Sequence, residues 1–168
     1  MITLKSLYLT LGMMSALIVN AQTSFDVPQN VELKSKDDYA KYEDVIIGAS
    51  KWLEATDLDK ETGKRLEVNT FVIQWITGSP TVTIEVNEQL GKAYGKNAQL
   101  LAIYLASYAR NFLEQKNIAT KFSATKAGLI SMINVYKNGI EISKSKEMEK
   151  LIKLDESKLD GYIKDKLL

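Results

Sequence analysis

The stretch "LLAIYLASYARNFLE", Leu100–Glu114, decides the fold, because it is the most hydrophobic part of the chain after the first 20 residues. The 13 residues that precede Arg110, from Asn97 on, carry no charge, yet a bilayer span takes about 20 residues. A helix here is apolar nearly all the way round, so other helices must cover it. It has a stripe of large residues and a stripe of alanines: Leu101, Leu105, Tyr108 and Phe112; Ala98, Ala102, Ala106 and Ala109. Because alanines let neighbouring helices approach closely, the segment is predicted to be the central helix of a bundle.

Three further segments have helical periodicity and are expected to cover the central helix. Residues 36–55 have apolar side chains at a 3-4-3-4 spacing, and Ser35 with Asp38 predicts a capping box at their start. Residues 60–77 are apolar around most of the circumference, so this helix is predicted to be largely buried. Its apolar residues are Leu66, Val68, Phe71, Val72, Ile73, Trp75 and Ile76. Residues 123–138 form the third covering helix.

The tail and one ambiguous segment complete the predicted architecture. Residues 143–168 are amphipathic, with Asp155 as the expected cap of a separate last helix. Residues 81–86, "TVTIEV", alternate like a strand that could pair with 140–143, although a helix is also compatible with this stretch. The predicted fold class is all-α: a single-domain helical bundle of about five to six helices over residues 35–168, with the short two-stranded element as an open alternative.

The N-terminus has the pattern of a secretory signal peptide. Lys5 precedes an uncharged apolar segment, Leu7–Val19, and small residues stand before a cleavage point that follows Ala21. We therefore predict a signal peptide over residues 1–21, cleaved after Ala21, and a flexible lead-in over residues 22–34. The expected location is the periplasm or the cell exterior, and an uncleaved anchor is the alternative.

Charge divides the chain into two unequal halves. Residues 22–90 contain 13 acidic and 7 basic residues, whereas residues 91–168 contain 8 acidic and 14 basic residues. This asymmetry indicates either a basic face for an anionic partner, or two halves that neutralise each other by docking, within one chain or between two, or that lie on opposite sides of one domain. We favour docking or opposite sides over a basic face, and nucleic acid is not an expected partner, because the basic half contains acids and few aromatics for stacking on bases.

The composition excludes several kinds of active site. The chain has neither histidine nor cysteine, which excludes Ser-His-Asp triads, Cys-His dyads, thiolate zinc sites and His-ligated iron or copper. Asp57, Asp59 and Glu61 alternate like the start of a calcium loop. Thr62 and Val68, however, stand where that loop needs glycine and glutamate. We expect no metal, no cofactor and no catalytic residues, and we favour a non-enzymatic protein while a hydrolase without His or Cys stays an open alternative.

Two other motifs lack essential parts. "SATK" at Ser123–Lys126 and "SKSK" at Ser143–Lys146 fit S-x-x-K, but the S-D-N and K-T-G sequences of penicillin-recognising enzymes are absent. The acidic pairs Asp37-Asp38 and Glu43-Asp44 consist of adjacent residues, which point in different directions on a helix. A hydrolase that works without His or Cys is therefore the weakest functional hypothesis for this chain.

Four residues are candidates for contact with a ligand. Arg110 follows the apolar run, so its guanidinium is expected near buried surface with an acidic partner or an anionic ligand, or reaching out to solvent. Tyr104, Trp52 and Tyr94 could line a cleft between helices or belong to the core.

The segments "NAQ", "WITGSPTVTIEV…LLAIYLASYARNFLE" and "MINVYKNG…MEKLIKLD" resemble those of small uncharacterised helical proteins among the exported proteins of Bacteroidota. The resemblance covers most of residues 40–155 and implies a helical fold and export, with no functional residues to carry over. The function expected is binding to another protein or an envelope component by a non-enzymatic exported protein. The alternatives are a carrier of a small apolar or anionic ligand in an inter-helix cleft, and a hydrolase without His or Cys. The oligomeric state is left open.

Overall fold

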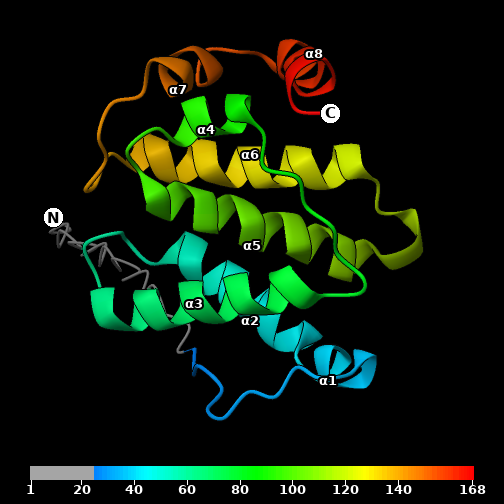
Figure 1. Ribbon diagram of the computed structural model, residues 1–168. Coiled ribbons are helices and arrows are strands. Elements are labelled where there is room, and N and C mark those ends of the chain that lie inside the picture. Colours follow the sequence, from blue (N-terminus) through cyan, green and yellow to red (C-terminus); the bar gives the residue numbers. More distant parts are fainter. Residues whose placement is uncertain (1–24) are drawn as a thin grey trace, which may run out of the picture.

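The computed structural model describes residues 25–168 and is all-helical over that range (Figure 1). The elements are α1 (Lys36–Lys41), α2 (Glu43–Ala55), α3 (Thr62–Gly78), α4 (Glu88–Tyr94), α5 (Ala98–Gln115), the 3₁₀ turn η1 (Lys116–Ile118), α6 (Lys121–Asn138), α7 (Lys146–Leu151) and α8 (Glu156–Lys166). The all-α prediction is confirmed, although eight α-helices in the described range exceed the five to six expected. The predicted signal peptide, residues 1–21, lies outside that range. None of the helices described there has the length and apolar character of a membrane span.

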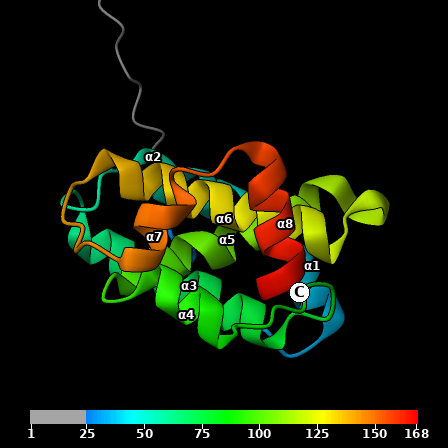
Figure 2. The same ribbon diagram turned by 90° about the horizontal axis from the view of Figure 1, so that it is seen from above.

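Helix α5 is the central element, as its composition predicted. It packs against α6 on one side and against α2 and α3 on the other (Figure 1). Nine of its residues are buried, and they include Leu100, Ile103 and the alanines at 102, 106 and 109. Helices α7 and α8 lie over α6, and α7 also contacts α4 (Figure 2). One apolar core therefore extends through the bundle.

The single helix expected over residues 36–55 is two helices. The capping box of Ser35 and Asp38 begins α1 as predicted. Tyr42 separates α1 from α2, because its backbone, at φ −104° and ψ 4°, leaves the helical region. The Trp75 indole N–H donates to the Tyr39 carbonyl at 3.0 Å, and the Tyr42 ring packs edge-on against Phe71. These contacts hold the bend against α3.

Helix α3 is only partly buried, and the expectation that it would be covered on most sides is wrong. Leu66 is 68% exposed and Ile73 is 45% exposed. The buried side of the helix consists of Arg65, Val68, Phe71, Val72 and Trp75. This difference arises because α2 and α5 cover one side of α3 and no helix of the described chain packs on the opposite side.

The two-stranded element does not form in the described chain. Residues 81–86 are extended, but they lie over α5, with Val82 buried and the Thr83 carbonyl accepting a hydrogen bond from the Tyr108 hydroxyl at 3.1 Å. Residues 140–143 are held elsewhere, because the Asn97 side chain bonds both the N–H and the carbonyl of Ser143 at 2.8 Å. Apolar and polar residues therefore alternate over residues 81–86 because one side of this connector is buried against α5. The alternation does not indicate pairing with another strand. Helix α4, which follows it, was not predicted.

The acidic and basic halves contact each other within one chain. The Arg110 guanidinium pairs with Glu54 at 3.0 Å, and the Lys121 ammonium pairs with Glu85 at 2.8 Å. Asp155 caps α8 as expected, by accepting from the Lys158 N–H at 2.9 Å. Residues 25–34, which belong to the predicted lead-in, contain no helix, and their apolar side chains pack on the core.

Candidate ligand-binding surface

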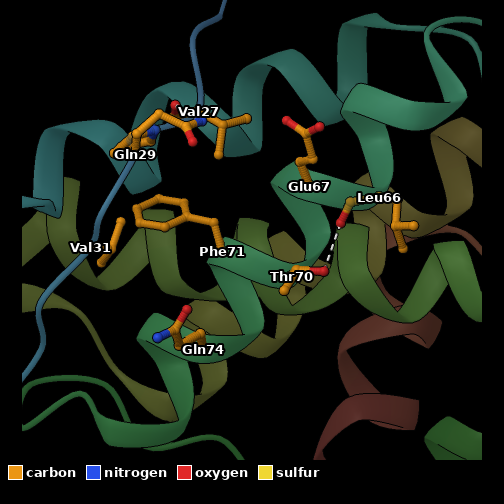
Figure 3. Close-up of a pocket in the computed structure, with 9 residues that line it drawn as sticks. Val27, Gln29, Val31, Leu66, Glu67, Thr70, Phe71 and Gln74 are labelled. Atoms are coloured by element: carbon orange, nitrogen blue, oxygen red, sulfur yellow. Dashed lines mark hydrogen bonds between the residues drawn. The ribbon is translucent and has the colours of Figure 1, made fainter.

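The exposed side of α3 is bordered by a hollow that faces the N-terminal segment. This hollow has a volume of about 480 Å³ and lies between residues 27–31 and α3. Val27, Gln29 and Val31 lie across it from Phe71, as Figure 3 shows. Its remaining lining residues on α3 are Leu66, Glu67, Thr70 and Gln74. The hollow forms because the chain approaches α3 in an extended conformation, without a helix that would fill the space.

A second hollow of about 430 Å³ lies on the other side of α3, between α3 and α5. Its lining is Thr62, Arg65, Leu66, Asn69, Thr70, Ile73, Ala98, Gln99 and Ala102. Three of these residues have a buried polar atom without a hydrogen-bond partner: Arg65 Nε, Asn69 Oδ1 and Gln99 Oε1. Buried polar groups in proteins are nearly always paired with protein or with ordered water, so these three atoms require a partner from outside the chain.

Arg65 is the most deeply buried charge of the described chain, with 2% of its surface exposed. Its terminal nitrogens donate to the backbone carbonyls of Leu53 at 3.3 Å and Asp57 at 3.2 Å, and to that of Thr56. The carbonyls at a helix C-terminus lack partners within the helix, so Arg65 both satisfies the end of α2 and complements its dipole. Burial lowers the pKa of Arg65, and the charges of Asp57 and Glu61 act in the opposite direction.

A third hollow, of about 320 Å³, lies between α3 and the extended connector. Ile73 lines both this hollow and the second one, and Leu66 and Thr70 line both the first and the second. We call this continuous surface, the ridge of Leu66, Thr70 and Ile73 with its three hollows, the α3 face. Only Glu67 and Arg65 among its lining residues are charged, although 26% of the whole sequence is. The α3 face is thus a nearly uncharged surface on which apolar side chains alternate with hydroxyl and amide side chains.

Arg110, the residue that the sequence singled out, has acidic partners. Its guanidinium bonds Glu54 at 3.0 Å and lies 4.0 Å from Glu114, which also pairs with Lys51 at 2.8 Å. Two cations and two carboxylates neutralise each other in this cluster. An anionic ligand at Arg110 would therefore have to displace a carboxylate.

None of the three aromatic candidates belongs to this cluster or to the lining residues of the α3 face. Tyr104 is 2% exposed and packs against α6 at Gly128. Trp52 is 2% exposed, and the charged ends of Lys64 and Arg65 lie over its ring, at 5.4 and 5.5 Å from the centroid. Tyr94 is half-buried at the end of α4, where its carbonyl accepts from the Asn97 backbone. The structure does not bring these side chains together with Arg110 around one hollow.

Sequence reasoning missed Arg65, Asn69 and Gln99. A signal for Arg65 was present, because it shares a 3-4-3 spacing with Val68, Val72 and Trp75, all of which are buried. A charged residue in register with a buried apolar stripe must find internal partners. Asn69 and Gln99 carry no comparable signal, since amides are common on exposed helix surfaces.

The other motifs have structural partners. Ser123 caps α6 from inside its first turn, and its hydroxyl donates to Asn111 at 3.0 Å. Lys126 pairs with Glu156 at 2.8 Å and with Asp160 at 2.7 Å, which ties α6 to α8. In the described residues, no group of three or more acidic side chains is arranged to hold a metal ion.

Comparisons of the chain with protein-family models, with curated proteins and with solved structures gave no match.

Proposed function

We propose that this protein is an exported, non-enzymatic binding protein that holds another protein or an envelope component on its α3 face. The observation that carries the proposal is the exposure of Leu66 and Ile73 on a nearly uncharged, hollowed surface. Large apolar side chains that are exposed together on a hollowed surface are typical of interaction sites. Export is supported by Lys5, the apolar segment after it and the small residues before the position after Ala21.

Site-specific photo-cross-linking in the native host tests this proposal. A photoreactive phenylalanine derivative at Leu66 or Ile73 should give the same cross-linked species from both positions. The matched control is the same derivative at Ile130, an exposed isoleucine of α6 that is 39% exposed and lies outside the α3 face. Equal products from Ile130, or none from α3, would overturn the proposal.

A second candidate function is the carrying of a small ligand between α3 and α5. The unpaired atoms of Arg65, Asn69 and Gln99 favour it, because a surface that served only apolar contact has no need of polar groups beneath it. A native mass spectrum of protein from the host's envelope fraction should then show a reproducible added mass that denaturation removes.

A further inference from the structure

We infer that the hollow between α3 and α5 binds the primary carboxamide group of an uncharged and otherwise apolar molecule. The inference rests on the proposed function, because it assigns a ligand chemistry to part of the α3 face. It starts from the three buried polar atoms without partners, which come from two helices. Arg65 and Asn69 lie one turn apart on α3, so their side chains are neighbours, and Gln99 lies in the first turn of α5.

The hydrogen-bonding needs of these atoms define the head group. Arg65 Nε carries a hydrogen and needs an acceptor, whereas Asn69 Oδ1 and Gln99 Oε1 need donors. A primary carboxamide supplies one carbonyl oxygen and two N–H groups, which complements this set of one donor and two acceptors. A carboxylate supplies acceptors only and would face two amide oxygens, and a hydroxyl group supplies a single hydrogen.

The charges around the hollow also favour a neutral ligand. The guanidinium of Arg65 is already engaged by the carbonyls of Leu53, Thr56 and Asp57. The negative charges of Asp57 and Glu61 act on it as well. Little positive potential is therefore left for an anion, and the remaining unpaired N–H is suited to a carbonyl oxygen.

The walls of the hollow define the rest of the ligand. Leu66, Ile73, Ala98 and Ala102 present only carbon to it. Its volume of about 430 Å³ falls in the range of small-molecule sites, roughly 300–1,000 Å³. The three polar atoms are covered in the ligand-free arrangement, so the half-buried side chains of Asn69 and Gln99 must turn to admit the head group. The ligand then supplies the partners that the free protein lacks.

The experiment compares three probes of equal chain length, octanamide, octanoate and 1-octanol, by NMR titration of the folded protein. Octanamide should bind at least tenfold more tightly than either of the others and should shift the amide signals of α3 and the start of α5. Asn69→Leu and Gln99→Leu should each reduce that preference to less than threefold. Asn134→Leu, which removes an exposed amide from α6, is the matched control and should keep it.

Each other outcome has a defined meaning. If octanoate binds as tightly as octanamide or more tightly, the Asn69 and Gln99 side chains present their N–H groups to the ligand instead of their oxygens. The assignment of a carboxamide ligand is then overturned, while the α3 face remains a binding surface. If none of the probes binds, or all bind equally and the leucine variants change nothing, the inference is overturned. The cross-linking from Leu66 and Ile73 then still decides the proposed function by itself.

Discussion

Helix α5 is closely packed on its α6 side and hollow on its α3 side. Towards α6, the Tyr104 side chain and backbone lie against Gly128, and the Ser107 and Ser131 hydroxyls bond at 2.8 Å. Towards α3, Ala98 and Ala102 border a hollow of about 430 Å³ whose polar atoms lack partners. On the α6 side the small residue is Gly128 of the facing helix, which admits Tyr104, whereas on the α3 side the small residues are Ala98 and Ala102 of α5 itself.

The comparison shows what an alanine stripe can and cannot determine. Gly128 lets the Tyr104 ring and backbone approach α6 closely because it has no side chain, whereas Ala98 and Ala102 do not by themselves bring α3 close. Where the facing residues are Asn69 and Ile73, the same small side chains leave space. The hollow between α3 and α5 therefore depends on which two or three residues face each other across it. Substitutions at these positions can fill or widen the hollow without changing the fold.

The largest expected effect on stability concerns Arg65, the buried cation that lines the hollow between α3 and α5. Arg65→Leu leaves the carbonyls of Leu53 and Thr56 without the donor that Arg65 supplies, and that of Asp57 with only the Lys60 N–H, so we expect a loss of about 3–5 kcal/mol in the free energy of unfolding. Urea unfolding followed by circular dichroism measures it. Lys64→Leu is the control, because Lys64 lies over the same Trp52 ring but is partly exposed, and it should cost less than about 0.5 kcal/mol. Similar losses for the two variants would mean that Arg65 acts only by covering Trp52.

A smaller loss is expected on the closely packed side. A Cβ atom at Gly128 would lie 2.8 Å from both the Tyr104 ring and its backbone oxygen, and backbone cannot move aside cheaply. Gly128→Ala should therefore destabilise the protein by about 1–3 kcal/mol despite the better helix propensity of alanine. Gly161→Ala in α8, where nothing lies within 4 Å of the added atom, should instead stabilise it by up to about 1 kcal/mol. A stabilising Gly128→Ala would show that α5 and α6 lie further apart.

The sequence predicted the central helix because its signal is periodic and local. Thirteen uncharged residues with two stripes leave few alternatives, and the caps at Ser35 and Asp155 involve residues three positions apart. The bend at Tyr42 and the exposure of Leu66 were not predictable in this way. They depend on contacts with α3 and on which of its sides lacks a covering helix, and apolar composition does not contain that information.

The candidate site shows the same limit. Arg110 was noticeable because it ends an apolar run, but the sequence could not show that Glu54, 56 residues away, would neutralise it. Arg65 stands among polar residues and is noticeable only from its register with Val68 and Val72. The partners that define both arginines are distant in sequence, and for Arg65 they are backbone atoms, which have no sequence signature.

The ion pair of Arg110 with Glu54 provides a weaker test, at the contact of α5 with α2. Arg110→Met should cost about 1 kcal/mol, because the pair with Glu54 is partly exposed and screened by solvent. Combining it with Glu54→Gln should recover part of that loss, with a coupling energy of about 0.5–1 kcal/mol in a double-mutant cycle. Lys51→Met, which removes a more exposed partner of Glu114, should be nearly neutral. A coupling of several kcal/mol would show that the cluster is more deeply desolvated than its exposure indicates.

The smallest effect on stability should come from filling the hollow. Ala98 is exposed and begins α5, so Ala98→Leu places a larger side chain in the space beside Asn69 and Gln99 without displacing a packed neighbour. The free energy of unfolding should change by less than about 0.5 kcal/mol, as for Ala40→Leu on the exposed side of α1. Octanamide binding, however, should be lost in Ala98→Leu and kept in Ala40→Leu. If Ala98→Leu instead costs several kcal/mol, α3 packs directly on the alanine stripe in solution, and the two sides of α5 are alike.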